Sequence, residues 1–152
     1  MGRVSELVRQ LTGSPSASKA RSSCLVAADA LTRVYGVLLI APTDVSTVWM
    51  WPASLPADFR DHVGQRHPVA LVILAHYAAL VGCFRDRWYL EGWSEHVFEA
   101  LDEALDEGWR EWLEYPRSFG PKDLEEAVRE MNERPRGDDG DAAPKHDCPL
   151  GR

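Results

Sequence analysis

Hydrophobic residues recur at helical spacing along most of this chain, and one segment is apolar on all sides. From residue 69 to residue 84 apolar side chains occupy every face of a helical wheel, and His76 and Tyr77 are the main polar interruptions. A helix surrounded by other helices has this pattern, and Pro68 suits the first turn of such a helix. We therefore predict that this segment is the buried central helix of an all-α domain.

One-sided apolar patterns predict further helices around the central one. The last long one carries an acidic outer face, and we expect a break near Gly108. Residues 45–51 could form a strand, but nothing else in the chain supplies a partner strand, so we expect an extended loop whose Trp49 and Trp51 enter the core. The helices that we predict besides the central one cover residues 4–12, 24–41, 56–65, 93–112 and 122–133.

Turn-forming and polar stretches suggest three parts of the chain. Residues 1–23 are expected to hold a short helix and a linker, because the stretch from residue 13 to residue 23 is rich in serine. Residues 24–133 are expected to form the helical domain. Residues 134–152 lack apolar periodicity and are expected to be a disordered tail.

Length and composition fit one globular domain. The chain has 152 residues, of which 45% are hydrophobic. Its longest apolar run, Val69 to Val81, is shorter than the roughly 20 residues that a membrane span requires, and no secretory signal pattern is visible. We therefore expect an intracellular protein without a membrane span. Three widely spaced cysteines suggest neither a disulfide framework nor a metal knuckle.

The charge is divided unevenly along the chain. The net charge is −7, yet residues 1–90 hold nine Lys/Arg against six Asp/Glu, whereas residues 91–139 hold six against sixteen. An acidic half repels a phosphate backbone. We therefore expect no direct binding of nucleic acid by this chain.

Catalytic and metal-binding patterns are weak in this sequence. The stretch from Gly92 to His96 has a serine between glycine and histidine, but a nucleophile elbow needs a second glycine and a preceding strand; Ser94 is more simply a helix N-cap. Neither the Glu and His residues near it nor His146 and Cys148 have the repeated ligands of a metal site. We expect no enzyme and no metal site.

His76 and Tyr77 allow two interpretations. They are either core residues whose polar atoms bond to neighbouring groups, or polar anchors in an apolar pocket that orients a small molecule with a single hydroxyl. For the second interpretation, Phe84 lies seven residues after Tyr77 on the same stripe, and the corner that follows supplies a wall. The candidate ligand-binding residues are His76, Tyr77, Phe84, Trp88 and Trp93.

The central segment and its flanks resemble a known family. The run from Ala70 to Ala78, "ALVILAHYA", is followed by Trp88, then by Gly92 and Trp93, and later by the pattern "WREWLEYP" at residues 109–116. Together with "WPASLPADF" at residues 51–59, this is similar to the C-terminal part of the regulatory region in fungal binuclear-zinc-cluster transcription factors, of the sterol uptake control type. The resemblance covers about residues 25–117.

The resemblance implies a helical regulatory domain that responds to a sterol or another lipid, acts in the nucleus or the cytoplasm and belongs to a transcription factor. The six-cysteine DNA-binding cluster of that family is missing, so zinc is not expected in this chain, and most of the preceding regulatory helices are missing too. Missing helices would leave apolar surface exposed. The alternative is therefore a helical interaction module without a ligand, which associates with itself or with a related factor.

Overall fold

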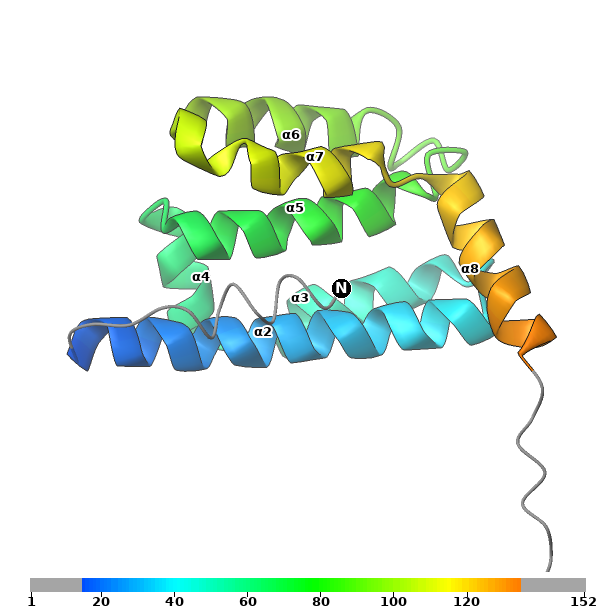
Figure 1. Ribbon diagram of the computed structural model, residues 1–152, viewed down its shortest axis with the longest axis horizontal. Coiled ribbons are helices and arrows are strands. Elements are labelled where there is room, and N and C mark those ends of the chain that lie inside the picture. The colour runs from blue at the N-terminus through cyan, green and yellow to red at the C-terminus, as the bar shows by residue number, and fades with distance from the viewer. Residues whose placement is uncertain (1–14, 135–152) are drawn as a thin grey trace, which may run out of the picture.

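The computed structural model describes residues 15–134, and within this range the fold is all-α, as predicted (Figure 1). No strand occurs among these residues. Seven α-helices and two short 3-10 helices follow one another along the chain: α2 (Pro15–Ile40), η1 (Val45–Trp49), α3 (Met50–Ser54), α4 (Ala57–Gly64), α5 (Pro68–Gly82), α6 (Trp93–Ala104), η2 (Glu107–Trp109), α7 (Glu111–Ser118) and α8 (Pro121–Glu133).

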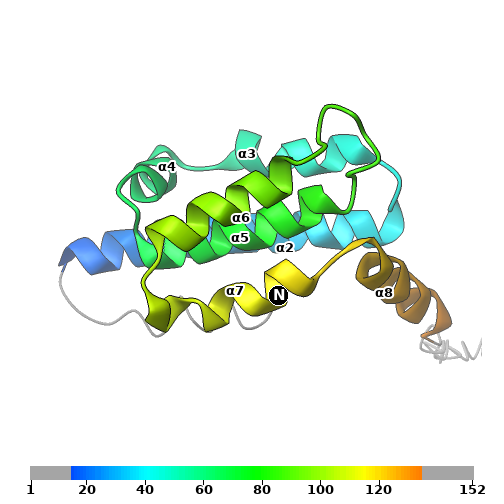
Figure 2. The ribbon, with the colours of Figure 1, turned by 90° about the horizontal axis from the view of Figure 1, so that it is seen from above.

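The helices form layers with α5 in the middle. The long helix α2 lies along one side of α5, and α6 and α7 cover the opposite side (Figure 1). Viewed at right angles, α3 and α4 lie along one flank, and α7 and α8 lie along the other (Figure 2). Every residue of α5 from Val69 to Val81 is buried except Leu74. The prediction of a buried central helix is confirmed.

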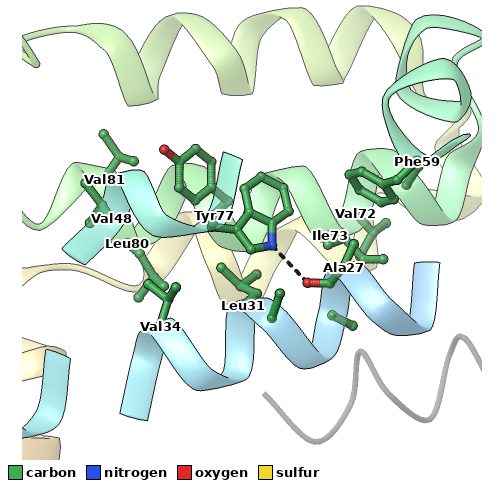
Figure 3. Close-up of a cluster of buried hydrophobic side chains, with 14 of the residues drawn as sticks. Ala27, Leu31, Val34, Val48, Phe59, Val72, Ile73, Tyr77, Leu80 and Val81 are labelled. Atoms are coloured by element: carbon green, nitrogen blue, oxygen red, sulfur yellow. Dashed lines mark hydrogen bonds between the residues drawn. The ribbon is translucent and has the colours of Figure 1, made fainter. Parts of the chain in front are cut away.

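The core has two parts because α5 is covered on both sides. One cluster joins α5 to α2, α3 and α4 and includes Trp51 and Phe59, whose rings meet edge to face at a centroid distance of 5.8 Å. The indole Nε1–H of Trp51 donates a hydrogen bond to the carbonyl oxygen of Ala27 in α2 at 2.8 Å (Figure 3). The second cluster joins α5 to α6 and α7 through Phe98, Leu101 and Leu113, among others.

The helix predicted at residues 24–41 is longer than expected. It begins at Pro15, so the linker prediction is wrong for residues 15–23. Ala20 and Ser23 are buried in the domain, and the Ser23 hydroxyl donates to the carbonyl oxygen of Ala20 at 3.1 Å. A serine whose hydroxyl bonds to its own helix is tolerated there, and burial against neighbouring helices outweighs its low intrinsic helix propensity.

The segment that we expected to be an extended loop is helical. The Asp44 carboxylate accepts hydrogen bonds from the backbone N–H and the hydroxyl of Ser46, which caps the start of η1. Trp51 is buried as predicted, but Trp49 is about half exposed. The prediction that both tryptophans enter the core is therefore correct for Trp51 only, because a helical turn directs neighbouring side chains to different sides.

The later helices agree better with the sequence pattern. The predicted break near Gly108 is confirmed, since α6 ends at Ala104 and α7 begins at Glu111. The predicted last helix corresponds to α8. The N-cap of α6 is Gly92, in the left-handed conformation at φ 71°, and not Ser94. Ser94 is buried one residue inside the helix, where its hydroxyl donates to the carbonyl oxygen of Ala78 in α5 at 2.8 Å.

Some predictions lie outside the described residues. These are the helix at residues 4–12 and the disordered tail beyond Arg134. Within the described part, the segment Ser18–Ile40 of α2 is long and apolar enough to cross a membrane by length and composition alone. A helix that packs in a protein core meets the same criterion, and α2 contributes eight buried hydrophobic residues to the domain core.

Candidate functional site

His76 lies on the side of α5 that faces α7. Its Nδ1 is 2.9 Å from the carbonyl oxygen of Val72 and, because a carbonyl only accepts, this nitrogen carries the proton. Its ring centroid is 6.0 Å from that of Tyr115 in α7. Burial lowers the pKa of His76, and the hydrogen bond to Val72 opposes this effect in part. The imidazole is therefore neutral at pH 7 and forms part of the packed interior.

The cavity beside His76 is small. Its volume is about 40 Å³, whereas small-molecule sites in proteins occupy roughly 300–1,000 Å³. This space suits one or two water molecules and not a sterol. Besides His76 it is lined by Tyr35, Ala79, Leu80, Tyr115, Pro116 and Phe119.

Tyr77 faces a different set of neighbours. Its ring stacks on Trp51 at a centroid distance of 4.4 Å and meets the edge of Trp93 at 5.9 Å. Figure 3 shows Tyr77 among the buried side chains of this cluster. Burial raises the pKa of Tyr77 to about 12. Adjacent residues of a helix point about 100° apart, so His76 and Tyr77 do not line one cavity, and these contacts favour the core interpretation for both.

Phe84 lies beyond the end of α5 and is buried in the same core cluster as Tyr77. It also forms part of the wall of a surface depression of about 370 Å³ between the turn after α2 and the turn after α5. That depression contains none of the other four predicted residues. The five candidates are therefore distributed over a core, a small cavity and a surface, although Tyr77 and Trp93 are in contact.

The remaining candidates belong to a segment that we call the aromatic corner, residues 85–93. Trp88 is 83% exposed and Trp93 is 37% exposed. The rings of Trp88 and Tyr89 meet edge to face at 5.6 Å, and Tyr89 is also exposed. Trp88 thus presents its ring to the surface, whereas Trp93 is only partly exposed and packs its ring against Tyr77.

Successive turns hold the aromatic corner in place. Backbone N–H groups donate to the carbonyl three residues earlier from Phe84 to Val81, Arg87 to Phe84, Leu90 to Arg87 and Trp93 to Leu90, at 2.8–3.1 Å. Leu90 is buried and anchors the middle of the segment. Gly92 supplies the left-handed conformation that leads into α6. The exposed aromatic rings therefore extend from a backbone that is held by successive hydrogen bonds.

Further apolar side chains are exposed outside this corner. Leu90 of the corner belongs to the same core cluster as Val48 of η1, and Trp49 and Met50, at the junction of η1 and α3, are each about half exposed. The sequence pattern did not identify these two residues as surface residues. A single helical turn has no period from which its outer face could be inferred.

The structure contains a second cleft that the sequence did not suggest. Its volume is about 380 Å³, and charged residues of both signs line it together with Phe98 and Phe119. Arg117 at its edge forms an ion pair with Asp102 at 2.6 Å and lies over the Phe98 ring at 5.3 Å. An open cleft of mixed polarity is a poor match for a sterol, which is largely apolar.

No protein-family model, no curated protein sequence and no solved structure matches this chain.

Proposed function

We propose that this chain is a helical regulatory domain of the type found in fungal zinc-cluster transcription factors, and that it acts through association with a second copy of itself. The aromatic corner carries this proposal. The sequence features that resemble the family include Trp88, Gly92 and Trp93, and Trp88, at 83%, is the most exposed aromatic side chain among the described residues.

The composition of the corner suits a protein interface. Tryptophan, tyrosine and arginine dominate the binding energy of protein interfaces, and the corner contains Arg85, Arg87, Trp88 and Tyr89, all exposed. An ordered backbone reduces the entropy lost on binding. The exposed rings therefore offer a large apolar contact area at a low ordering cost.

The charges of the corner favour a second copy as the partner. Its sequence "RDRWYLEGW" carries two arginines, one aspartate and one glutamate, so its net charge is zero. In a two-fold symmetric contact, each contact between a residue of one copy and a residue of the other occurs twice, with the roles of the two copies exchanged. Arg87 of one copy can then lie against Glu91 of its partner while the two Trp88 rings bury each other.

A sterol-responsive form of the domain is the second candidate, and the resemblance of residues 70–93 to the sterol uptake control group favours it. A sterol would have to use an open cleft or widen the 40 Å³ cavity at His76. Such a regulatory domain would work in the nucleus or the cytoplasm without contacting DNA itself.

Sedimentation velocity over a concentration series tests the self-association. We expect the wild-type chain to form dimers. We expect Trp88→Ser to raise the concentration at which half of the chains are dimeric by at least about tenfold, which corresponds to a loss of about 1.4 kcal/mol in association free energy. Val26→Ser is the matched control, because Val26 is an exposed apolar residue that belongs to α2 and not to the aromatic corner. A monomer at all concentrations, or equal effects of the two substitutions, would contradict the proposal.

Tryptophan fluorescence titrated with sterols separates the two candidates. We expect no saturable response in the folded chain. A saturable response that Tyr77→Phe weakens would support the ligand-responsive form instead, because that substitution removes the hydroxyl and keeps the ring that stacks on Trp51. Circular dichroism of each variant confirms that it is folded.

A further inference from the structure

Two histidines lie side by side at the turn between α4 and α5. His62 is in the last turn of α4, and His67 is the N-cap residue of α5. Their ring centroids are 5.6 Å apart, with an angle of 52° between the ring planes. The backbone N–H of His67 donates to the carbonyl oxygen of His62 at 2.9 Å, and Arg66 between them adopts the left-handed conformation at φ 57°. The backbone of the turn thus fixes the two rings next to each other.

Each of these rings has a nitrogen without a partner. In residues 15–134, Nε2 of His62 and Nδ1 of His67 are the buried side-chain atoms that form no hydrogen bond. Leaving a buried polar atom unpaired is unfavourable, and a buried atom of this kind calls for an explanation such as an ion or a water molecule. Two such atoms on adjacent rings point to one shared partner.

We propose that His62 and His67 form a two-histidine binding site for a divalent transition-metal ion of the zinc and copper group. Imidazole nitrogens are preferred ligands of these ions, whereas Mg²⁺ and Ca²⁺ prefer oxygen. The described residues include no group of three or more potential ligands. The remaining coordination positions are therefore filled by water or by a group from outside the domain.

The separation of the rings fits a shared ion. An ion about 2.0–2.1 Å from each nitrogen lies about 3.2 Å from each ring centroid, so two rings at the tetrahedral angle have centroids about 5.2 Å apart. The observed distance of 5.6 Å is close to this value. Rotation of an imidazole about χ2 has broad minima, so both nitrogens can turn toward one ion without a change in the backbone.

The protonation state of His67 also favours metal binding. Burial lowers the pKa of His67, and the neighbouring His62 lowers it further. A neutral imidazole binds metal without first releasing a proton. Both residues are only partly buried, but the two unpaired nitrogens are themselves buried, so the rings must turn for an ion to reach these atoms from solvent. Once bound, it would link the end of α4 to the start of α5.

Titration with ZnCl₂, CuCl₂ and NiCl₂ tests this site in the full chain carrying His146→Gln and Cys148→Ser, since those two residues could also bind metal. The measurement is the ¹H–¹⁵N spectrum of the imidazole groups together with calorimetry. We expect shifts or broadening at His62 and His67, and we expect His62→Gln or His67→Asn to weaken binding at least about tenfold. Asparagine is a favourable N-cap, so His67→Asn preserves the start of α5.

The control is His96→Gln, because His96 is exposed on α6 and pairs only with Glu99 at 3.8 Å among the described residues. It should leave the affinity unchanged. The proposal would be overturned if the His62 and His67 variants bound metal as tightly as the chain that keeps both histidines. It would also be overturned if these two imidazoles showed no change at millimolar metal. A water molecule would then be the shared partner.

Discussion

The indole N–H of Trp51 and the carbonyl oxygen of Ala27 are joined by a 2.8 Å hydrogen bond that ties α3 to the middle of α2. The two residues are 24 positions apart, and both are buried. The same indole carries Tyr77 on its face and Phe59 at its edge. Trp51 therefore links three helices, α2, α4 and α5, at one point.

Trp51→Phe should destabilise the domain. Phenylalanine keeps an aromatic ring but loses the hydrogen bond, which contributes roughly 0.5–1.5 kcal/mol, and leaves a small cavity in addition. We expect a total loss of about 1–3 kcal/mol, measured by urea unfolding. Trp49→Phe is the matched control, because Trp49 is about half exposed, and it should change the free energy of unfolding by less than about 0.5 kcal/mol. Equal effects would show that the hydrogen bond to Ala27 is unimportant.

Gly82 and Ser94 should be energetically coupled. A Cβ on Gly82 would lie 2.9 Å from the Ser94 hydroxyl oxygen, which itself bonds to Ala78. We expect Gly82→Ala to destabilise the wild-type chain, and we expect a smaller cost in a Ser94→Ala background, where the Ser94 oxygen is absent. A double-mutant cycle by chemical unfolding should give a coupling energy of at least about 0.5 kcal/mol. Additive effects would argue against this close contact between α5 and α6.

Stability should fall as the pH falls below neutrality. His76 has a lowered pKa in the folded state because it is buried, and its ordinary value is 6.5. Below that pH His76 takes up a proton in the unfolded chain but not in the folded chain. The free energy of unfolding therefore decreases as the pH falls, until the pH reaches the pKa of His76 in the folded state. Each such histidine contributes a slope of up to about 1.4 kcal/mol per pH unit.

The slope of the unfolding free energy between pH 7 and pH 5 measures this effect. His76→Gln should make the slope shallower, whatever its effect on stability at pH 7. If the slope remains the same, His76 is protonated equally in the folded and unfolded states.

The two described thiols should be unreactive in the folded domain. Burial raises the pKa of Cys24 to about 11. The pKa of Cys83 is raised to about 12, and burial is the largest cause. The thiolate is the reactive form. In a Cys148→Ser variant, labelling with iodoacetamide at pH 8 should be slow and should become fast in denaturant. Mass spectrometry of the native sample would contradict this expectation if it found rapid modification.

The sequence by itself determined the central helix and the places where several helices start and stop. An apolar pattern on all faces has one stable solution in water, which is burial among other helices. Proline at residue 68 marks the start of α5, since proline fits the first turn of a helix. Gly108 likewise marked the break between α6 and α7.

Only the tertiary structure decided the environment of each polar or aromatic side chain. His76 and Tyr77 are adjacent in sequence, yet one faces α7 and the other packs on Trp51 and Trp93. Serine near the start of α2 was typical of a linker, but contacts with other helices keep that segment helical. Periodicity shows which face of a helix is apolar, whereas the neighbours that cover it, and thus the exposure of Trp88 or the pairing of His62 with His67, depend on packing between distant segments.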